Sequence, residues 1–204
     1  MSKGILLRVP EILVLDAMGV LYQAGDDVAE LLVPFVRRHG TAALSAEEID
    51  RAYVTASLGR MEPTEFWAHM GVEAAREDDY LAGHRLIDGT LDALPRLKAH
   101  YGRLACLSND ISRWSLKLRR QFGLEAWIDS WFISGDLGLR KPAPDIYRRV
   151  IADLGVTPRE IVFVDDRPRN LDAARDIGLQ TVLLAAGGTA VSSHRTIRAL
   201  AELL

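Results

Sequence analysis

The segment ILVLDAMGVL, residues 12–21, decides how this chain can fold. Its first four residues form a short apolar run, which is typical of a strand buried on both faces of a sheet. The run stops abruptly at Asp16, so a carboxylate follows the carboxyl end of the predicted strand. Ligands of open α/β sheets bind at this edge. A lone Asp at such a position more often serves a turn, so its interpretation depends on the residues at the ends of the other strands.

Four more apolar runs have the same character and predict further buried strands. They lie at 104–107, 131–134, 161–164 and 181–184. Helical patterns at 88–100, 111–122, 144–154 and 168–177 alternate with them. This alternation predicts an α/β fold: a Rossmann-like core with a parallel sheet and right-handed crossovers. A polar loop at 187–193 and a short terminal helix complete the expected order.

The long interval between the first two predicted strands indicates an insertion. Residues 23–85 are mainly helical in pattern, with a capping-box sequence at 45–48 and a helix start at Pro63. We therefore expect 1–22 and 86–204 to form the α/β core. Residues 23–85, the helical insertion, would form a small cap over the carboxyl edge of the sheet. Packing of these helices on the flank of the sheet is the alternative.

Length and composition exclude several classes of protein. The 204 residues suffice for one core and a small insertion. The net charge of -3 offers no electrostatic case for binding nucleic acid. No apolar run approaches the roughly 20 residues that span a bilayer, and the N-terminus lacks a signal-peptide pattern. We expect a cytoplasmic protein, a monomer or homodimer, without membrane or nucleic-acid partners.

Cysteine and histidine carry little functional signal. Cys106 is the only cysteine, which excludes an internal disulfide, and its apolar neighbours favour a small buried side chain over a nucleophile. The five histidines show no paired metal-ligand spacing, so a zinc site is not expected.

Polar side chains follow each of the first four predicted strands. Asp16 follows the first, Ser108 and Asn109 follow the second, and Lys141 lies in the loop after the third. Asp165 and Asp166 follow the fourth. In a parallel sheet these groups share one edge.

Three carboxylates in one small volume repel each other, and one lysine does not balance them. A hard divalent cation such as Mg²⁺ would hold them ionised, because it prefers carboxylate, water and phosphate oxygens. Ser108 and the N–H groups that open the next helix suit phosphate oxygens, and Lys141 adds a point charge. The pattern predicts a phosphoryl-transfer site with an Asp nucleophile and a small phosphorylated substrate.

Four sequence motifs occur in a fixed order along the chain. They are DAMGVL at 16–21, LSN at 107–109, GLRKPAPDIY at 138–147 and VDD at 164–166, with Asn170 and Gly178 downstream. In this order the chain resembles the haloacid dehalogenase superfamily of hydrolases, and the helical insertion is similar to the cap of its first subclass.

The resemblance implies a role for each motif residue. Asp16 would be the nucleophile that forms an aspartyl-phosphate, with Ser108 and Asn109 binding the phosphoryl group. Lys141 would stabilise its charge and hold Asp16 in place. Mg²⁺ would be bound by Asp16, the backbone carbonyl of Met18 and Asp165. Asp166 would ligate the metal directly or through water, or would pair with Lys141.

Two residues depart from the pattern of the family. Its phosphatases usually carry a second Asp two residues after the nucleophile, as general acid and base, where this chain has Met18. A thioether cannot transfer a proton, and loss of such a group typically costs about 10²–10⁴-fold in rate. Val20 stands where many members have Thr. Some similar members, with an Asp-x-Gly type of first motif, are sugar-phosphate phosphatases despite the same gap. Asp26 and Asp27 could supply the missing general acid. The alternative is that these two residues only form a solvated turn.

Two other functions remain open at this point. A 2-haloacid dehalogenase also lacks the second Asp and needs no metal, but the acidic pair Asp165-Asp166 would repel an anionic haloacid. The other alternative is a catalytically impaired binding protein. Its only support is Met18, which replaces the usual general acid.

The insertion should select the substrate, and several of its residues are candidates. Arg60, Glu62, Trp67 and His69, with Tyr22 at its start, lie where a cap could reach the site. Trp67 could instead fill the core of the insertion, and Arg60 and Glu62 could be solvated.

Overall fold

The computed structural model describes residues 12–185 and 192–204, and its centre is a six-stranded sheet. The strand order is β3-β2-β1-β4-β5-β6 and every pairing is parallel. The strands are β1 Ile12–Leu15, β2 Arg103–Ser108, β3 Ser130–Ile133, β4 Ile161–Asp165, β5 Gln180–Leu184 and β6 Arg195–Ile197. Because β1 pairs with both β2 and β4, the carboxyl ends of these three strands are neighbours.

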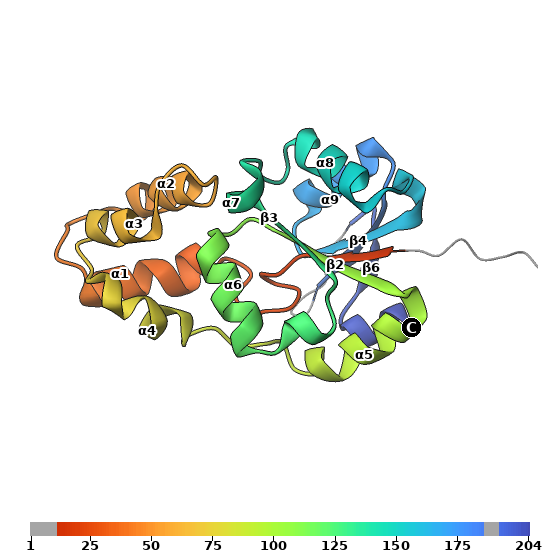
Figure 1. The fold of residues 1–204 in the computed structure, drawn as a ribbon, viewed down its shortest axis with the longest axis horizontal. Coiled ribbons are helices and arrows are strands. Elements are labelled where there is room, and N and C mark those ends of the chain that lie inside the picture. The colour runs from red at the N-terminus through yellow and green to blue at the C-terminus, as the bar shows by residue number, and fades with distance from the viewer. Residues whose placement is uncertain (1–11, 186–191) are drawn as a thin grey trace, which may run out of the picture.

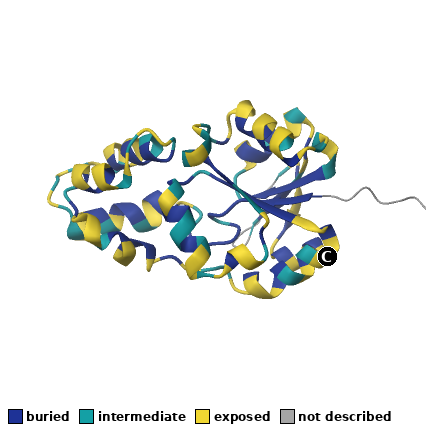
Figure 2. Cartoon of the chain, in the orientation of Figure 1, coloured by how far each residue is buried: buried dark blue, intermediate teal, exposed yellow. Residues whose placement is uncertain are grey.

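Helices cover both faces of the sheet, so the strands are buried (Figures 1 and 2). Leu13 and Leu15 pack on one side with α5 and α6, while Ile12 and Val14 pack on the other with α8 and α9. The helices of this part are α5 Thr90–Tyr101, α6 Ser112–Gln121, α7 Ser134–Leu137, α8 Pro144–Leu154 and α9 Pro168–Ile177. Short 3-10 turns lie at Leu124–Ala126, Pro158–Glu160 and Leu200–Leu203.

The predicted Rossmann-like α/β core is confirmed, with small differences. Ser134 opens α7 rather than ending a strand, and the expected terminal helix is a single 3-10 turn. The sequence did not predict β6, since this strand has only three residues and two of them are exposed. Most of the predicted polar loop, residues 187–191, lies outside the described residues, as does the N-terminus up to residue 11.

Between β1 and β2 the chain is helical, as predicted for the insertion. Its α-helices are α1 Val33–His39, α2 Ala46–Ala56, α3 Pro63–His69 and α4 Glu77–Leu81, with a π-helical segment at Val28–Leu32 and a 3-10 turn at Ala74–Arg76. They lie beyond the carboxyl edge of the sheet, at the left of Figure 1. The predicted capping box is present, because Ser45 and Glu48 bond each other's backbone N–H groups.

The two connections to the insertion run side by side. The N–H of Gln23 donates to the carbonyl of Arg85 at 2.9 Å, and the N–H of Ile87 donates to that of Leu21 at 2.9 Å. This pairing supports domain boundaries near residues 22 and 86, which stay a prediction.

The insertion and the core share an aromatic cluster. Trp114 of α6 is 1% exposed and its ring lies 5.2 Å from Trp67 and 4.9 Å from Tyr80, centroid to centroid. Both indole N–H groups donate to Oε2 of the buried Glu77, from 3.2 Å for Trp67 and 2.9 Å for Trp114. Lys117 of α6 lies 2.7 Å from the other oxygen of Glu77. These contacts seat the insertion firmly on the core.

We predict that Glu77→Ala lowers the free energy of unfolding by on the order of 3 kcal/mol, since two buried indole donors lose their acceptor. Glu77→Gln should cost less, because its amide oxygen can still accept. Asp78→Ala is the control: Asp78 also pairs with Lys117 but is exposed, so its loss should change stability far less. Denaturant unfolding measures all three. Equal effects of Glu77→Ala and Asp78→Ala would contradict the assigned role of Glu77.

Candidate active site

A buried lysine joins two carboxylates at the carboxyl edge of the sheet. Nζ of Lys141 lies 2.7 Å from Oδ1 of Asp16, which follows β1, and 2.8 Å from Oδ2 of Asp165, which ends β4. The side chains of Lys141 and Asp165 are 1% and 0% exposed. The N–H of Ala17 also donates to Oδ1 of Asp16 at 2.6 Å, so one oxygen of this carboxylate is held by two donors.

Asp165 is oriented from the helix that follows it. The Nδ2 of Asn170 lies 3.0 Å from both carboxylate oxygens of Asp165, and the N–H of Arg167 donates to Oδ1 at 2.8 Å. The hydroxyl of Tyr147 donates to the backbone carbonyl of Asn170 at 2.9 Å. Asn170 and Tyr147 belong to the motif pattern noted in the sequence, and the structure shows what they contact.

The carboxylates of Asp16, Asp165 and Asp166 form a cluster suited to a hard cation. One oxygen from each lies within 4.8 Å of the others. Oδ1 of Asp166 is buried without a hydrogen-bond partner among the described residues. Acceptor-only oxygens in this arrangement fit Mg²⁺, which takes oxygen ligands.

The pKa values of these acids indicate that positive charge is needed here. Burial raises the pKa of Asp16 well above its usual value, with Lys141 opposing and Asp165 adding to the effect. Burial, and then Asp165, raise the pKa of Asp166 to about 6. Burial alone would lower the pKa of Lys141, but Asp16 and Asp165 raise it, so the lysine stays charged. A bound cation would favour the ionised form of all three acids.

Ser108 and Asn109 lie beside this cluster but are engaged differently. Oγ of Ser108 is buried and has no hydrogen-bond partner among the described residues, which leaves it available to a ligand. The Asn109 side chain pairs with the backbone of Lys141: Nδ2 donates to its carbonyl at 2.9 Å and Oδ1 accepts from its N–H at 2.8 Å. Asn109 therefore positions the Lys141 loop, and a contact with phosphate stays a prediction.

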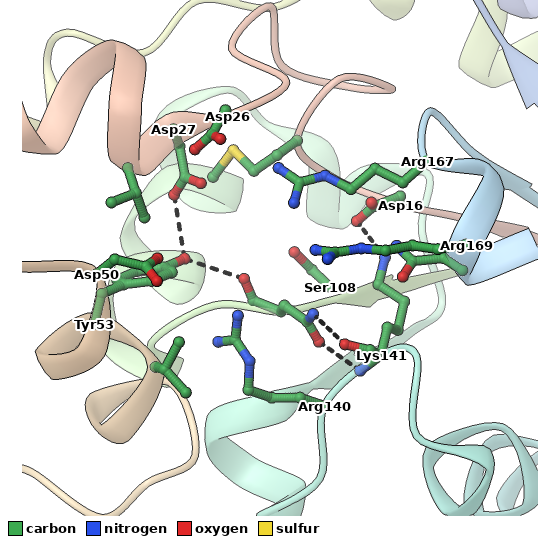
Figure 3. Close-up of a pocket in the computed structure, with 15 residues that line it drawn as sticks. Asp16, Asp26, Asp27, Asp50, Tyr53, Ser108, Arg140, Lys141, Arg167 and Arg169 are labelled. Carbon is green, nitrogen blue, oxygen red and sulfur yellow. Dashed lines mark hydrogen bonds and ion pairs between the residues drawn. The ribbon is translucent and has the colours of Figure 1, made fainter. Parts of the chain in front are cut away.

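These groups open into a cavity of about 460 Å³ between the sheet edge and the insertion (Figure 3). The core supplies Asp16, Met18, Ser108, Asn109, Arg140, Lys141, Arg167, Arg169 and Asn170, and the insertion supplies Asp26, Asp27, Val28, Asp50, Tyr53 and Val54. Few of these side chains are apolar, so the cavity suits a small hydrophilic ligand.

The insertion residues that line the cavity differ from the candidates chosen from the sequence. Arg60, Glu62 and His69 are exposed and do not line it. Trp67 is fully buried in the aromatic cluster, and Tyr22 is also buried away from the cavity. The choice among residues of a predicted helix depends on how that helix docks, which periodicity does not determine.

The sequence interpretation also missed three arginines and Tyr53. Arg140 precedes Lys141, and Arg167 and Arg169 follow the Asp165-Asp166 pair, so their places inside two motifs were the available signal. Tyr53 lies outside every motif, so nothing in the sequence indicated that it lines the cavity. Its hydroxyl lies 3.1 Å from both Oδ2 of Asp27 and the carbonyl oxygen of Asn109, which are contacts between distant segments.

The structure also shows where the only cysteine lies and which other groups of side chains come together. Cys106 is fully buried, and burial raises its thiol pKa, so a nucleophilic role is disfavoured. Within residues 12–185 and 192–204, the only carboxylate, His or Cys cluster able to hold a metal is the one described. None of the helices there combines the length and apolar character needed to cross a bilayer.

Comparison with known proteins assigns the family. The model of the haloacid dehalogenase-like hydrolases matches residues 10–178, so the chain belongs to this family of hydrolases. The predicted resemblance is thereby confirmed.

Two curated relatives match over part of their length. Flavin mononucleotide hydrolase 1 of Arabidopsis thaliana is 33% identical over 98 residues, or 48% of this chain and 40% of the relative. A phosphorylated carbohydrates phosphatase of Thermotoga maritima is 27% identical over 129 residues, or 57% of this chain and 60% of the relative. The chain thus spans about half the length of these relatives.

Two of the solved structures that share the fold illustrate the likeness. A haloacid dehalogenase family enzyme from Bacteroides thetaiotaomicron, solved as a magnesium complex, has a TM-score of 0.74 at 24% identity, covering 90% of this chain and 98% of its own. The L-2-haloacid dehalogenase of Xanthobacter autotrophicus has a TM-score of 0.67 at 19% identity, covering 95% and 96%. At these identities the likeness concerns the fold alone.

Gly19 provides a test of how Asp166 is placed. Its φ is +73°, and a Cβ there would lie 2.3 Å from Oδ2 of Asp166. Gly19→Ala should displace Asp166, which would weaken the binding of a hard cation to this cluster, in addition to the backbone strain of about 1–2 kcal/mol. Gly123→Ala is the matched control, because Gly123 has a φ of +67° but nothing within 4 Å of the added methyl group. Thermal unfolding with and without Mg²⁺ should separate the two variants, and equal Mg²⁺ responses would contradict the assigned contact.

Proposed function

We propose that this protein is a Mg²⁺-dependent phosphatase that hydrolyses a small phosphorylated metabolite through an aspartyl-phosphate on Asp16. The buried group of Asp16, Lys141 and Asp165, with Asp166 beside it, is the observation that carries the proposal. The carboxylate of Asp16 is held at the end of β1 next to the ammonium group of Lys141, which suits it to attack a phosphorus atom.

In this mechanism each residue has a separate task. Asp16 attacks phosphorus with one carboxylate oxygen while the ester oxygen leaves with the bonding electrons. The hydroxyl of Ser108 donates a hydrogen bond to the transferred phosphoryl group. Lys141 stabilises the negative charge that develops on that group. Asn109 and Asn170 hold Lys141 and Asp165 in place. Water then attacks the aspartyl-phosphate and releases inorganic phosphate.

Asp16, Asp165 and Asp166, with the backbone carbonyl of Met18, would hold the Mg²⁺ ion. A bound ion would supply positive charge that keeps these acids ionised and offsets the negative charge of the phosphoryl group. The unpartnered oxygen of Asp166 and the raised pKa values of Asp16 and Asp166 support its presence.

The cavity lining supports a hydrophilic phosphate ester as substrate. Arg140, Arg167 and Arg169 line it, and no carboxylate of the described residues lies within ion-pair distance of their guanidinium groups. Arg140 and Arg167 donate to Ser57 and to the carbonyl of Gly25, which leaves their charges without an ion-pair partner. Guanidinium groups of this kind beside a reacting centre favour an anionic ligand. The names of the relatives, which include a phosphorylated carbohydrates phosphatase, support a phosphomonoester.

The cellular location, the oligomeric state and the domain boundaries are part of the same proposal. We place it in the cytoplasm as a monomer or homodimer, with residues 1–22 and 86–204 as the core domain and 23–85 as the cap. The net charge of -3 supports a small-molecule partner rather than nucleic acid.

A substrate screen tests the reaction directly. In the presence of Mg²⁺ the protein should release inorganic phosphate from sugar or polyol phosphates, and Asp16→Asn should lower turnover by roughly 10⁴-fold or more, since an amide is a poor nucleophile. Circular dichroism should show that the variant keeps its fold. Halide release from 2-haloacids in excess chelator, without phosphate release, would favour the dehalogenase alternative.

Metal binding can be measured without turnover. Mg²⁺ should raise the unfolding midpoint of the wild-type protein, because a ligand that binds only the native state stabilises it. Asp165→Asn should reduce this shift, since it removes a charged ligand. Asp153→Asn, an exposed acid on α8, should respond like the wild-type protein. A full Mg²⁺ shift in Asp165→Asn would argue against the proposed ligand set.

A further inference from the structure

The proposed reaction needs a proton for the leaving oxygen, and Met18 cannot supply one. Among the acids that line the cavity, Asp27 is distinct because it is only 6% exposed and lies on the side of the insertion. Figure 3 shows its carboxyl group on the same side of the cavity as Tyr53, with Arg167 between it and Asp16.

The hydrogen bonds of Tyr53 show which form of Asp27 fits the site. The hydroxyl of Tyr53 lies 3.1 Å from Oδ2 of Asp27 and 3.1 Å from the carbonyl oxygen of Asn109. A hydroxyl has one proton to donate, and a backbone carbonyl can only accept. If Asp27 is ionised, Tyr53 can donate its one proton to only one of these two oxygens. If Asp27 is neutral, it can donate its own proton to Tyr53 while Tyr53 donates to Asn109, so that both contacts become full hydrogen bonds. The geometry thus favours a neutral carboxylic acid in the cavity.

We propose that Asp27 is the general acid of this enzyme and takes the role that Met18 cannot perform. This inference rests on the proposed phosphatase function. It assigns a catalytic role to a residue of the insertion, whereas the nucleophile belongs to the core.

The electrostatic surroundings of Asp27 agree with this role. Burial raises its pKa to about 6, while the hydrogen bond from Tyr53 and the charge of Arg167 lower it and Asp26 raises it. Asp110 and Tyr80 also interact with Asp27; burial raises the pKa of Asp110, and a hydrogen bond with Tyr53 lowers it. Asp50 and Arg140 line the same cavity. A general acid works best with a pKa close to the pH at which the enzyme operates.

Asp27 loses its proton in the first half of the reaction and regains one in the second. In the first, Asp16 forms a bond to phosphorus, the ester P–O bond breaks, and Asp27 gives its proton to the departing oxygen, which leaves as an alcohol. In the second, the ionised Asp27 takes a proton from the attacking water as the phosphate leaves Asp16. Inorganic phosphate is released, Asp16 is regenerated, and Asp27 is neutral again.

The neighbouring Asp26 is poorly suited to this role. It is exposed, and its Oδ1 accepts the N–H of Ala29 at 3.1 Å, which caps the following helical turn. It therefore provides a matched control: an adjacent acid at the same cavity without the bond to Tyr53.

The leaving group of the substrate provides the test. An alkyl phosphate needs a proton on its leaving oxygen, whereas p-nitrophenyl phosphate does not. In Asp27→Asn, the rate of enzyme phosphorylation by an alkyl phosphate should fall about 10²–10⁴-fold. With p-nitrophenyl phosphate a near-normal burst of nitrophenolate should precede slow turnover, since water attack lacks its base. The acid-quenched phosphoenzyme should accumulate to match the burst.

The controls separate this inference from the proposed function. The amide introduced by Asp27→Asn can donate to Tyr53 as the neutral acid does, so this variant should keep the wild-type unfolding midpoint. Asp26→Asn should keep the wild-type ratio between the two substrates. Wild-type turnover with an unchanged ratio in Asp27→Asn overturns the role of Asp27 alone. A wild-type protein that releases neither leaving group overturns the phosphatase proposal itself.

Discussion

The Lys141 ammonium between Asp16 and Asp165 is the interaction on which the site depends. It joins the end of β1, the end of β4 and the loop after α7, and all three side chains are buried. Removing one partner of such a buried pair typically costs about 3–5 kcal/mol, because the other charge is left uncompensated. Since two acids share one lysine, the group is short of positive charge. The parallel pairing of β1 with β4 creates this shortage, and a bound cation relieves it.

The second constraint is the docking of the insertion, which closes the cavity from the opposite side. Ser134 donates to the carbonyl of Ser57 at 2.5 Å, and Arg167 donates to the carbonyl of Gly25 at 2.6 Å. With the Trp114 and Glu77 contacts, these bonds hold the insertion at several separate points. A cavity whose walls are fixed in this way selects ligands by a pre-formed shape and charge. Both parts of the chain thus contribute side chains to one cavity.

Met18 gives this shared cavity a particular consequence. In the motif pattern of the family's phosphatases, the proton donor lies in the loop that also carries the nucleophile. Here that position is occupied by a thioether, and the buried acid with a suitable hydrogen bond lies on the insertion. Proton transfer would then depend on the docked position of the insertion, so that a structural contact through Tyr53 would also be part of the chemistry.

The sequence alone determined the α/β class, the helical insertion and the convergence of Asp16, Ser108, Lys141, Asp165 and Asp166, because these follow from local periodicity and from the rule that parallel strands end at one edge. Tertiary structure decided that Asn109 holds the Lys141 loop, that Trp67 lies in a buried cluster, and that Tyr53 and Asp27 face the site. These placements depend on how the insertion and the core dock. Docking is set by side-chain packing between segments distant in the chain, and no local pattern records it.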